Sequence, residues 1–147
     1  DRAIPNGSSL ALLAEYQGRR VLLTGDAYAP VLVDALARVP GNAGGRLRLE
    51  AMKLSHHGSR GNTSGDLVRA LDCRNWLVST NGKIFHHPDG ETIARVLRDG
   101  GAGVQLHFNY RSEYNEIWAA PGLQRKHGYV ARYPANEGEA VFLDLAG

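Results

Sequence analysis

Two adjacent histidines stand at the end of the apolar run Leu47–Leu54, inside the sequence Ser-His-His-Gly-Ser that covers residues 55–59. Imidazole is the commonest metal ligand in proteins and the usual general acid or base near neutral pH. A second pair, His86 and His87, follows another apolar segment, so four of the six histidines lie in two short stretches. This concentration favours a reaction or a metal site over isolated surface or core histidines.

A carboxylate stands in a third stretch of the same kind. Asp26 follows Gly25 directly after the apolar run Val21–Leu23. A lone Asp at such a place caps a turn or a helix about as often as it has a function. Together with imidazoles, however, it forms the ligand set expected for Zn²⁺, Mn²⁺ or Fe, which lower the pKa of bound water and supply hydroxide near neutral pH.

Three questions about these residues stay open. Adjacent side chains of an extended segment point to opposite sides, so His56 and His57 can face one ion only if the turn into Gly58 brings both inward. Ser55 or Ser59 could serve a histidine and Asp26 as a nucleophile, but no G-x-S-x-G motif is present, which ranks a serine hydrolase below a metal enzyme. Lys53 is either a surface residue or a phosphate contact.

Hydrophobic patterning predicts an alternation of strands and helices along the chain. A hairpin of Ser9–Tyr16 and Arg20–Thr24 comes first. Further strands are expected at Leu47–Leu54, Asn75–Ser79 and Val104–Phe108, and a terminal hairpin is expected from Tyr129–Tyr133 and Ala140–Leu145 around Asn136-Glu137-Gly138. Helices are expected after Pro30 with Leu32, Ala35, Leu36 and Val39 on one face, over Asp66–Leu71, and after Pro88 with Ile93, Val96 and Leu97 on one face.

This rhythm predicts an α/β fold in a single domain, with a partly parallel sheet. In such sheets chemistry gathers at the carboxyl ends of the strands, where the loops with Asp26, His56 and His87 would meet.

Composition limits the classes of function. The chain has 147 residues, a formal net charge of +2 and scattered Lys and Arg, which makes a weak electrostatic case for nucleic acid. The single cysteine, Cys73, excludes an internal disulfide and a multi-cysteine metal site. No apolar run is long enough to span a membrane and no signal peptide is visible, so a cytoplasmic location is the expectation.

The motifs occur in an order that resembles a known family. Asn6–Leu10 leads to Leu22–Asp26, Met52–Ser59 follows, and Val78–Asn81 is followed by His87-Pro88. As a set over residues 6–108 they resemble the C-terminal half of a metallo-β-lactamase-fold hydrolase, in the branch related to DNA-uptake (competence) proteins. The resemblance implies an αβ/βα sandwich of two similar halves with one or two metal ions (Zn, or Mn or Fe) between them.

The resemblance also implies roles for particular residues. Asp26 would take the position of the bridging carboxylate, with His56 and His87 as further metal ligands. His57 would act as acid, base or alternate ligand. Candidate substrate contacts are Lys53, Ser59 and Asn81.

One departure from the family pattern is serious. Family members carry an N-terminal half with a His-x-His-x-Asp-His motif that supplies most of the metal ligands, and nothing here matches it. Either that half lies elsewhere, as a missing partner of this chain, or the chain is a degenerate, metal-free relative. We therefore expect the 147-residue chain alone to be a poor catalyst and to leave one sheet face exposed or covered by a partner.

Two hypotheses about function follow. The first is a metal-dependent hydrolase of a phosphodiester or other ester, with metal-bound hydroxide as nucleophile and a nucleic acid or nucleotide as substrate. The alternative is a catalytically inactive metallo-β-lactamase-like module that binds a protein or nucleic-acid partner. Residues 109–147 fit no family pattern and are expected to form an irregular extension, either a binding surface or a cover for a sheet edge.

Overall fold

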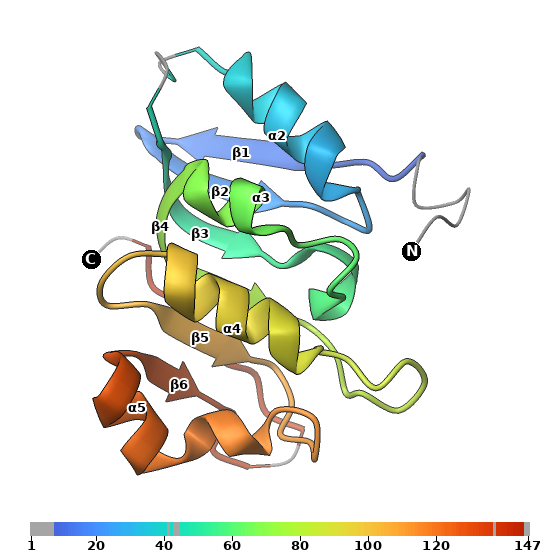
Figure 1. The fold of residues 1–147 in the computed structure, drawn as a ribbon, viewed down its shortest axis with the longest axis vertical. Coiled ribbons are helices and arrows are strands. Elements are labelled where there is room, and N and C mark those ends of the chain that lie inside the picture. Colours follow the sequence, from blue (N-terminus) through green and yellow to red (C-terminus); the bar gives the residue numbers. More distant parts are fainter. Residues whose placement is uncertain (1–7, 41, 43–44, 137, 146–147) are drawn as a thin grey trace.

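The computed structural model of the chain describes residues 8–40, 42, 45–136 and 138–145. Within these ranges six strands form one sheet, whose spatial order is the order in the sequence (Figure 1). The antiparallel hairpin of β1 (Leu12–Tyr16) and β2 (Arg19–Leu23) forms one edge. The remaining strands all pair in parallel: β3 (Leu47–Lys53), β4 (Leu71–Val78), β5 (Gln105–Phe108) and β6 (Val130–Arg132). The mixed α/β class expected from the sequence is confirmed.

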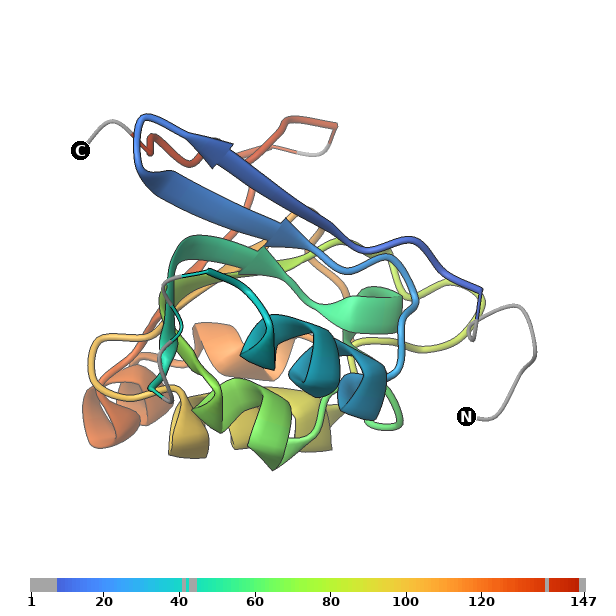
Figure 2. The same ribbon diagram turned by 90° about the horizontal axis from the view of Figure 1, so that it is seen from above.

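Helices connect the parallel strands on one side of the sheet. They are α2 (Ala29–Ala37), α3 (Gly65–Arg69), α4 (Gly90–Asp99), the 3₁₀ segment η2 (Glu116–Ala119) and α5 (Pro121–His127). Figure 2 shows these helices together below the sheet. The reason is topological, because right-handed crossovers that always step to the next strand in the same direction must all pass over the same face.

The core lies between the sheet and these helices. Met52, Trp76 and Leu106 are register partners on β3, β4 and β5, and each is 0% exposed. They belong to the same buried cluster as Leu67 of α3 and Ile93 of α4. The large side chains of the parallel strands thus anchor the carboxyl-terminal halves of the strands, from which the site loops leave.

The opposite face of the sheet has no helical layer in the described part of the chain. Lys53, Leu77 and His107 are the next register partners on β3, β4 and β5, and alternation places them on this face. Leu23 of β2, which pairs with Lys53, is 41% exposed. Figure 2 shows the chain after β6 returning on this side of the sheet.

The C-terminal region differs from the expectation. The terminal hairpin is wrong, because β6 pairs in parallel with β5 and residues 140–145 form no strand. The helix α5, which the sequence analysis did not anticipate, provides the crossover that brings β6 in parallel. Of the turn expected at 136–138, Glu137 lies outside the described residues.

Several boundaries also move. The short helix α3 ends at Arg69 instead of Leu71, and β4 begins already at Leu71. At the start of α3 the Ser64 side chain caps the helix by accepting from the Leu67 N–H. The helices expected after Pro30 and Pro88 are present as α2 and α4. None of the helices in the described ranges has the length and apolar character that a membrane crossing requires.

Candidate functional site

Three loops meet at one edge of the sheet, on the right of Figure 1, where the parallel strands β2, β3 and β4 end. Hydrogen bonds join these loops to one another. The Ser55 hydroxyl donates to the Ala27 carbonyl over 2.6 Å, and the His56 N–H donates to the Gly25 carbonyl over 3.0 Å. On the other side the Asp89 N–H donates to the Gly58 carbonyl over 3.1 Å. The middle loop is therefore fixed to both neighbours.

The adjacent histidines lie in a tight turn. They are part of the 3₁₀ segment η1 (Ser55–Gly58), and both have left-handed backbones, with φ of 46° at His56 and 58° at His57. Such values are uncommon for residues other than glycine and cluster at functional sites. The turn brings the two ring centroids within 6.1 Å, so the pair does not point to opposite sides as an extended strand would place it.

The His57 ring is held by a backbone carbonyl. Its Nδ1 lies 2.6 Å from the Ser79 carbonyl oxygen at the end of β4. A carbonyl oxygen can only accept, so Nδ1 carries the proton of this bond. In the neutral ring Nε2 then has a free lone pair, which suits a ligand or a general base.

The His56 ring is held in a similar way by Asn62. Its Nδ1 lies 3.2 Å from Asn62 Oδ1, while Asn62 Nδ2 donates to the Asp26 carbonyl over 2.9 Å. The donation to a carbonyl fixes the orientation of the amide, so Oδ1 accepts and His56 Nδ1 donates. This leaves Nε2 of His56 with a lone pair, and a tied Nδ1 of this kind is typical of metal-ligating histidines.

The second histidine pair divides between two environments. The His87 ring centroid lies 5.5 Å from that of His56, and its side chain is 12% exposed. Burial lowers the pKa of His87, and the nearby Asp89 carboxylate partly offsets this effect. His87 is therefore neutral at neutral pH, with Nδ1 3.5 Å from Asp89 Oδ1, which is long for a hydrogen bond. His86 instead packs on Tyr114, with ring centroids 4.8 Å apart, and so turns away from the cluster.

Asp26 and Lys53 lie close enough to interact electrostatically. The Asp26 N–H donates to the Ser9 hydroxyl over 2.8 Å, which positions the residue at the end of β2. Burial lowers the pKa of Lys53, and the Asp26 carboxylate partly offsets that effect. Lys53 Nζ donates to the Leu54 carbonyl over 3.2 Å. A partly desolvated ammonium beside the site can contact an anionic substrate.

The other predicted substrate contacts have different surroundings. Ser59 is 6% exposed, and its hydroxyl accepts from the Gly61 N–H. Asn81 is exposed in the loop after β4, and its Oδ1 accepts from the Lys83 N–H. The Ser55 hydroxyl also bonds to backbone, at Ala27. The two serines therefore serve the turn, and their hydrogen bonds give no support to the serine-hydrolase alternative.

The described residues do not bring together a full set of metal ligands. Among them no group of three or more His, Cys, Asp or Glu side chains is arranged to hold an ion. The close pair His56 and His87, together with the tied Nδ1 of His56, fits two positions of a coordination shell. A complete tetrahedral or octahedral shell would need ligands from outside the described residues.

Asn62 is the positioning residue that the sequence analysis missed. It is 0% exposed and belongs to no motif, so spacing carried no signal for it. Replacing Asn62 with alanine should lower the free energy of unfolding by about 1–3 kcal/mol, because the His56 ring and the Asp26 carbonyl lose their partner in a buried place. Urea unfolding measures this change. The control is Asn42→Ala. The Asn42 amide is partly buried, lies remote from the histidines and donates to the Leu36 carbonyl. Equal urea midpoints for Asn62→Ala and the unsubstituted chain would contradict the assignment.

Comparison with known proteins finds similarity to a bacterial protein at low identity. It is 27% identical over 129 residues to ComE operon protein 3 of Bacillus subtilis (strain 168). The match covers 82% of this chain and 16% of that protein, so the chain spans about one sixth of the length of its relative. No protein-family model matches the chain, and no solved structure matches it. The chain is thus a distant homologue of ComE operon protein 3.

Proposed function

We propose that this chain forms part of a metal-dependent hydrolase that cleaves phosphodiesters. The observation that carries the proposal is the convergence of His56, His57 and His87, with the Nδ1 of the first two tied to amide or backbone oxygens. In each of these two rings Nδ1 is thus the donating nitrogen, so that Nε2 is the unprotonated nitrogen of the neutral ring. The motif resemblance to metallo-β-lactamase-fold hydrolases supports the same reading, with Asp26, His56 and His87 as the residues that would hold an ion.

The side chains of this site can perform distinct tasks. His57 Nε2 can take a proton from an attacking water or return one to the leaving oxygen, while the Ser79 carbonyl keeps the ring in place. Lys53 can contact a non-bridging phosphoryl oxygen. A bound divalent ion would supply a water of lowered pKa and would neutralise charge on the phosphoryl group.

Nucleic acid or a nucleotide is the substrate class that we favour. Two similarities support it, the homology to ComE operon protein 3 and the resemblance of the motifs to DNA-uptake proteins. Both are analogies of sequence, and the substrate must be tested directly.

The test combines metal analysis with hydrolysis of bis(p-nitrophenyl) phosphate by the full-length protein that contains this chain. We expect hydrolysis that depends on Mn²⁺ or Zn²⁺ and stops with a chelator. Asp26→Ala should reduce both bound metal and turnover, whereas Asp34→Ala, at an exposed residue of α2 paired with Arg38, should change neither. Unchanged metal content and activity in Asp26→Ala would overturn the proposal.

A second candidate function is a metal-free binding module. The specific observation in its favour is that no group of three or more His, Cys, Asp or Glu side chains among the described residues is arranged to hold an ion, although three histidine rings lie near one another. Under this alternative the full-length protein would hold no stoichiometric metal and would show no hydrolysis. Metal analysis of that protein therefore separates the two functions.

A further inference from the structure

A cleft of about 310 Å³ opens beside the histidines. Of the side chains assigned to hydrolysis above, only His57 lines it. Its wall combines exposed apolar surfaces with small polar side chains. Ile84 is 76% exposed, Phe85 65% and Tyr110 45%. The polar members of the lining are Ser79, Thr80, Asn81 and Asn109. A group of exposed apolar side chains that lines one cleft beside a polar site is a candidate binding surface.

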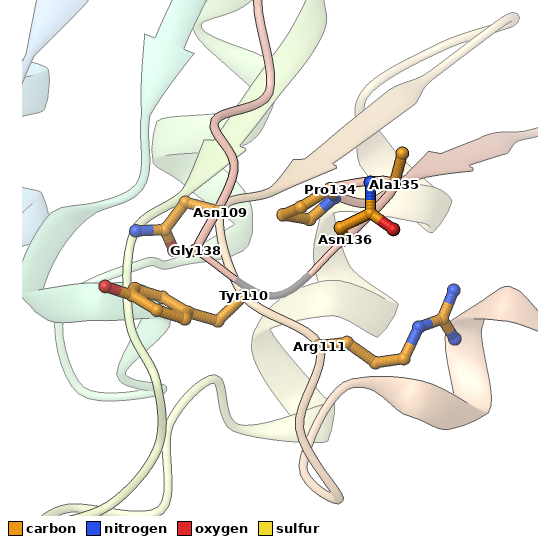
Figure 3. A pocket seen from close by; sticks show the side chains of 7 residues that line it. All are labelled: Asn109, Tyr110, Arg111, Pro134, Ala135, Asn136 and Gly138. Atoms are coloured by element: carbon orange, nitrogen blue, oxygen red, sulfur yellow. The ribbon is translucent and has the colours of Figure 1, made fainter.

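A second hollow of about 390 Å³ lies next to the first, and Figure 3 shows the side chains that line it. The two share Asn109 and Tyr110, and the second is closed on its far side by the segment with Pro134 and Asn136. Figure 3 shows Tyr110 and Arg111 extending in opposite directions from neighbouring positions of one segment. The two hollows are therefore neighbours, with His57 lining the first and Arg111 lining the second, and the surface from His57 past Tyr110 to Arg111 is called the path below.

The loop that displays Phe85 is held in place. The Thr80 N–H donates to Asn109 Oδ1 over 2.8 Å, and the Gly82 N–H donates to Thr80 Oγ1 over 3.0 Å. At Gly82 the backbone packs so closely on Tyr114 that an added Cβ would clash with its ring. The exposed apolar tip is thus presented by an anchored loop.

Phe85 connects the cleft with the histidine cluster. Its ring stacks on that of His87, with centroids 6.2 Å apart and an interplanar angle of 27°. The same ring meets the edge of His56 at 6.3 Å. A flat ligand stacked on the exposed side of Phe85 would therefore be separated from the histidines only by the Phe85 ring.

Two cations lie near this path, and one of them, Arg111, lines the second hollow. Lys83 is exposed in the same loop as Phe85, and Arg111 is exposed at the far end, where its guanidinium lies 4.2 Å from the centroid of the Tyr133 ring. Aromatic faces that alternate with cations suit a chain of bases and phosphates, because bases stack on the rings and phosphates pair with the cations. Purely apolar ligands would leave the lysine, the arginine and the amides unused.

We propose that this path binds unpaired nucleic acid, with one base stacked between Phe85 and Tyr110 and the flanking phosphates beside Lys83 and Arg111. The inference rests on the proposed function, in which a phosphodiester reaches His57, and it specifies the substrate as single-stranded. Bases of a duplex already stack on each other, so their faces are not available to side chains, whereas those of a single strand are.

The experiment measures binding of a fluorescent thymidine oligonucleotide of about 12 nucleotides, with a chelator present to prevent hydrolysis. Fluorescence anisotropy should show that Phe85→Ala and Tyr110→Ala each weaken binding by about tenfold, the usual effect of losing one stacked base. Tyr110→Phe should keep the affinity because it keeps the ring. Tyr16→Ala is the matched control, since Tyr16 is a 76% exposed aromatic on the edge strand β1.

An abasic oligonucleotide of the same length separates stacking from charge. It should bind more weakly than the thymidine chain, and Phe85→Ala and Tyr110→Ala should not weaken it further. Any one of four results would overturn the inference. The first two are equal affinity of the protein for both oligonucleotides and, in the two variants, equal losses of affinity for both. The other two are tighter binding of a blunt duplex and no binding at all. An apolar loop tip that binds no oligonucleotide would then be assigned to a protein contact.

The two proposals fail in different ways. Base-dependent binding without metal-dependent hydrolysis would uphold the single-strand path and overturn the proposed function. Hydrolysis of a small phosphodiester together with oligonucleotide binding that ignores Phe85 and Tyr110 would do the reverse.

Discussion

His57→Asn is expected to lower the proposed phosphodiesterase activity of the full-length protein by a factor of about 10²–10⁴, the usual contribution of a general acid or base. The substitution removes Nε2 but retains a nitrogen donor near the position of Nδ1, which can still donate to the Ser79 carbonyl. Asparagine also tolerates the left-handed backbone of this position, where φ is 58°. The loss should therefore appear in kcat with little change in stability.

His86→Asn is the control for this experiment. His86 is likewise a histidine with a left-handed backbone, with φ of 59°, but its ring packs on Tyr114 away from the cluster. Hydrolysis rates and urea midpoints of both variants give the comparison. Equal activity of His57→Asn and the unsubstituted protein would remove His57 from the proposed chemistry.

Gly58→Ala is expected to destabilise the chain by about 2–5 kcal/mol, from left-handed strain and from overpacking together. Gly58 has φ of 89°, and an added Cβ would lie 2.8 Å from Pro88 Cβ and 3.4 Å from Pro88 Cα. Proline cannot rotate aside, so the loops of His57 and His87 must separate. Hydrolysis should fall as well, because the two loops carry the histidines that must stay together.

Gly18→Ala separates the two contributions. Gly18 also has a left-handed backbone, with φ of 75°, yet nothing lies within 4 Å of an added Cβ. It should cost only about 1–2 kcal/mol, the strain alone. Urea unfolding of both variants measures the difference, and equal losses would show that the contact with Pro88 is unimportant.

The parts of the fold that the sequence predicted are those with local patterning. Two such patterns each lie within a single element. They are the helical spacing of Ile93 and Val96 in α4 and the apolar run of β3. The alternation of helices and strands along the chain then predicts a parallel sheet. The C-terminal region was mispredicted because its order comes from contacts between elements. The Tyr133 hydroxyl donates to the Asn115 carbonyl, and the Tyr129 hydroxyl donates to the Trp118 carbonyl. Such pairings leave no period in the sequence.

The candidate site shows the same division. The positions of Asp26, His56 and His87 at strand ends could be predicted, since parallel neighbours end at one edge. The orientation of the rings could not be predicted, because it depends on the left-handed turn and on Asn62 from a later loop. For the same reason the sequence left open that His87 joins His56 while His86 turns away.

The strand order has a consequence for inheritance. Because β2, β3 and β4 are neighbours in both sequence and space, all three site loops are encoded within residues 25–89. Genetic exchange with breakpoints outside this stretch transfers the histidines, Asp26 and their mutual hydrogen bonds as one block. An exchange inside it separates loops that are hydrogen-bonded to each other. The units that contain β5 and β6 can then diverge, and change what the path beyond Tyr110 accepts, while the histidine cluster stays intact.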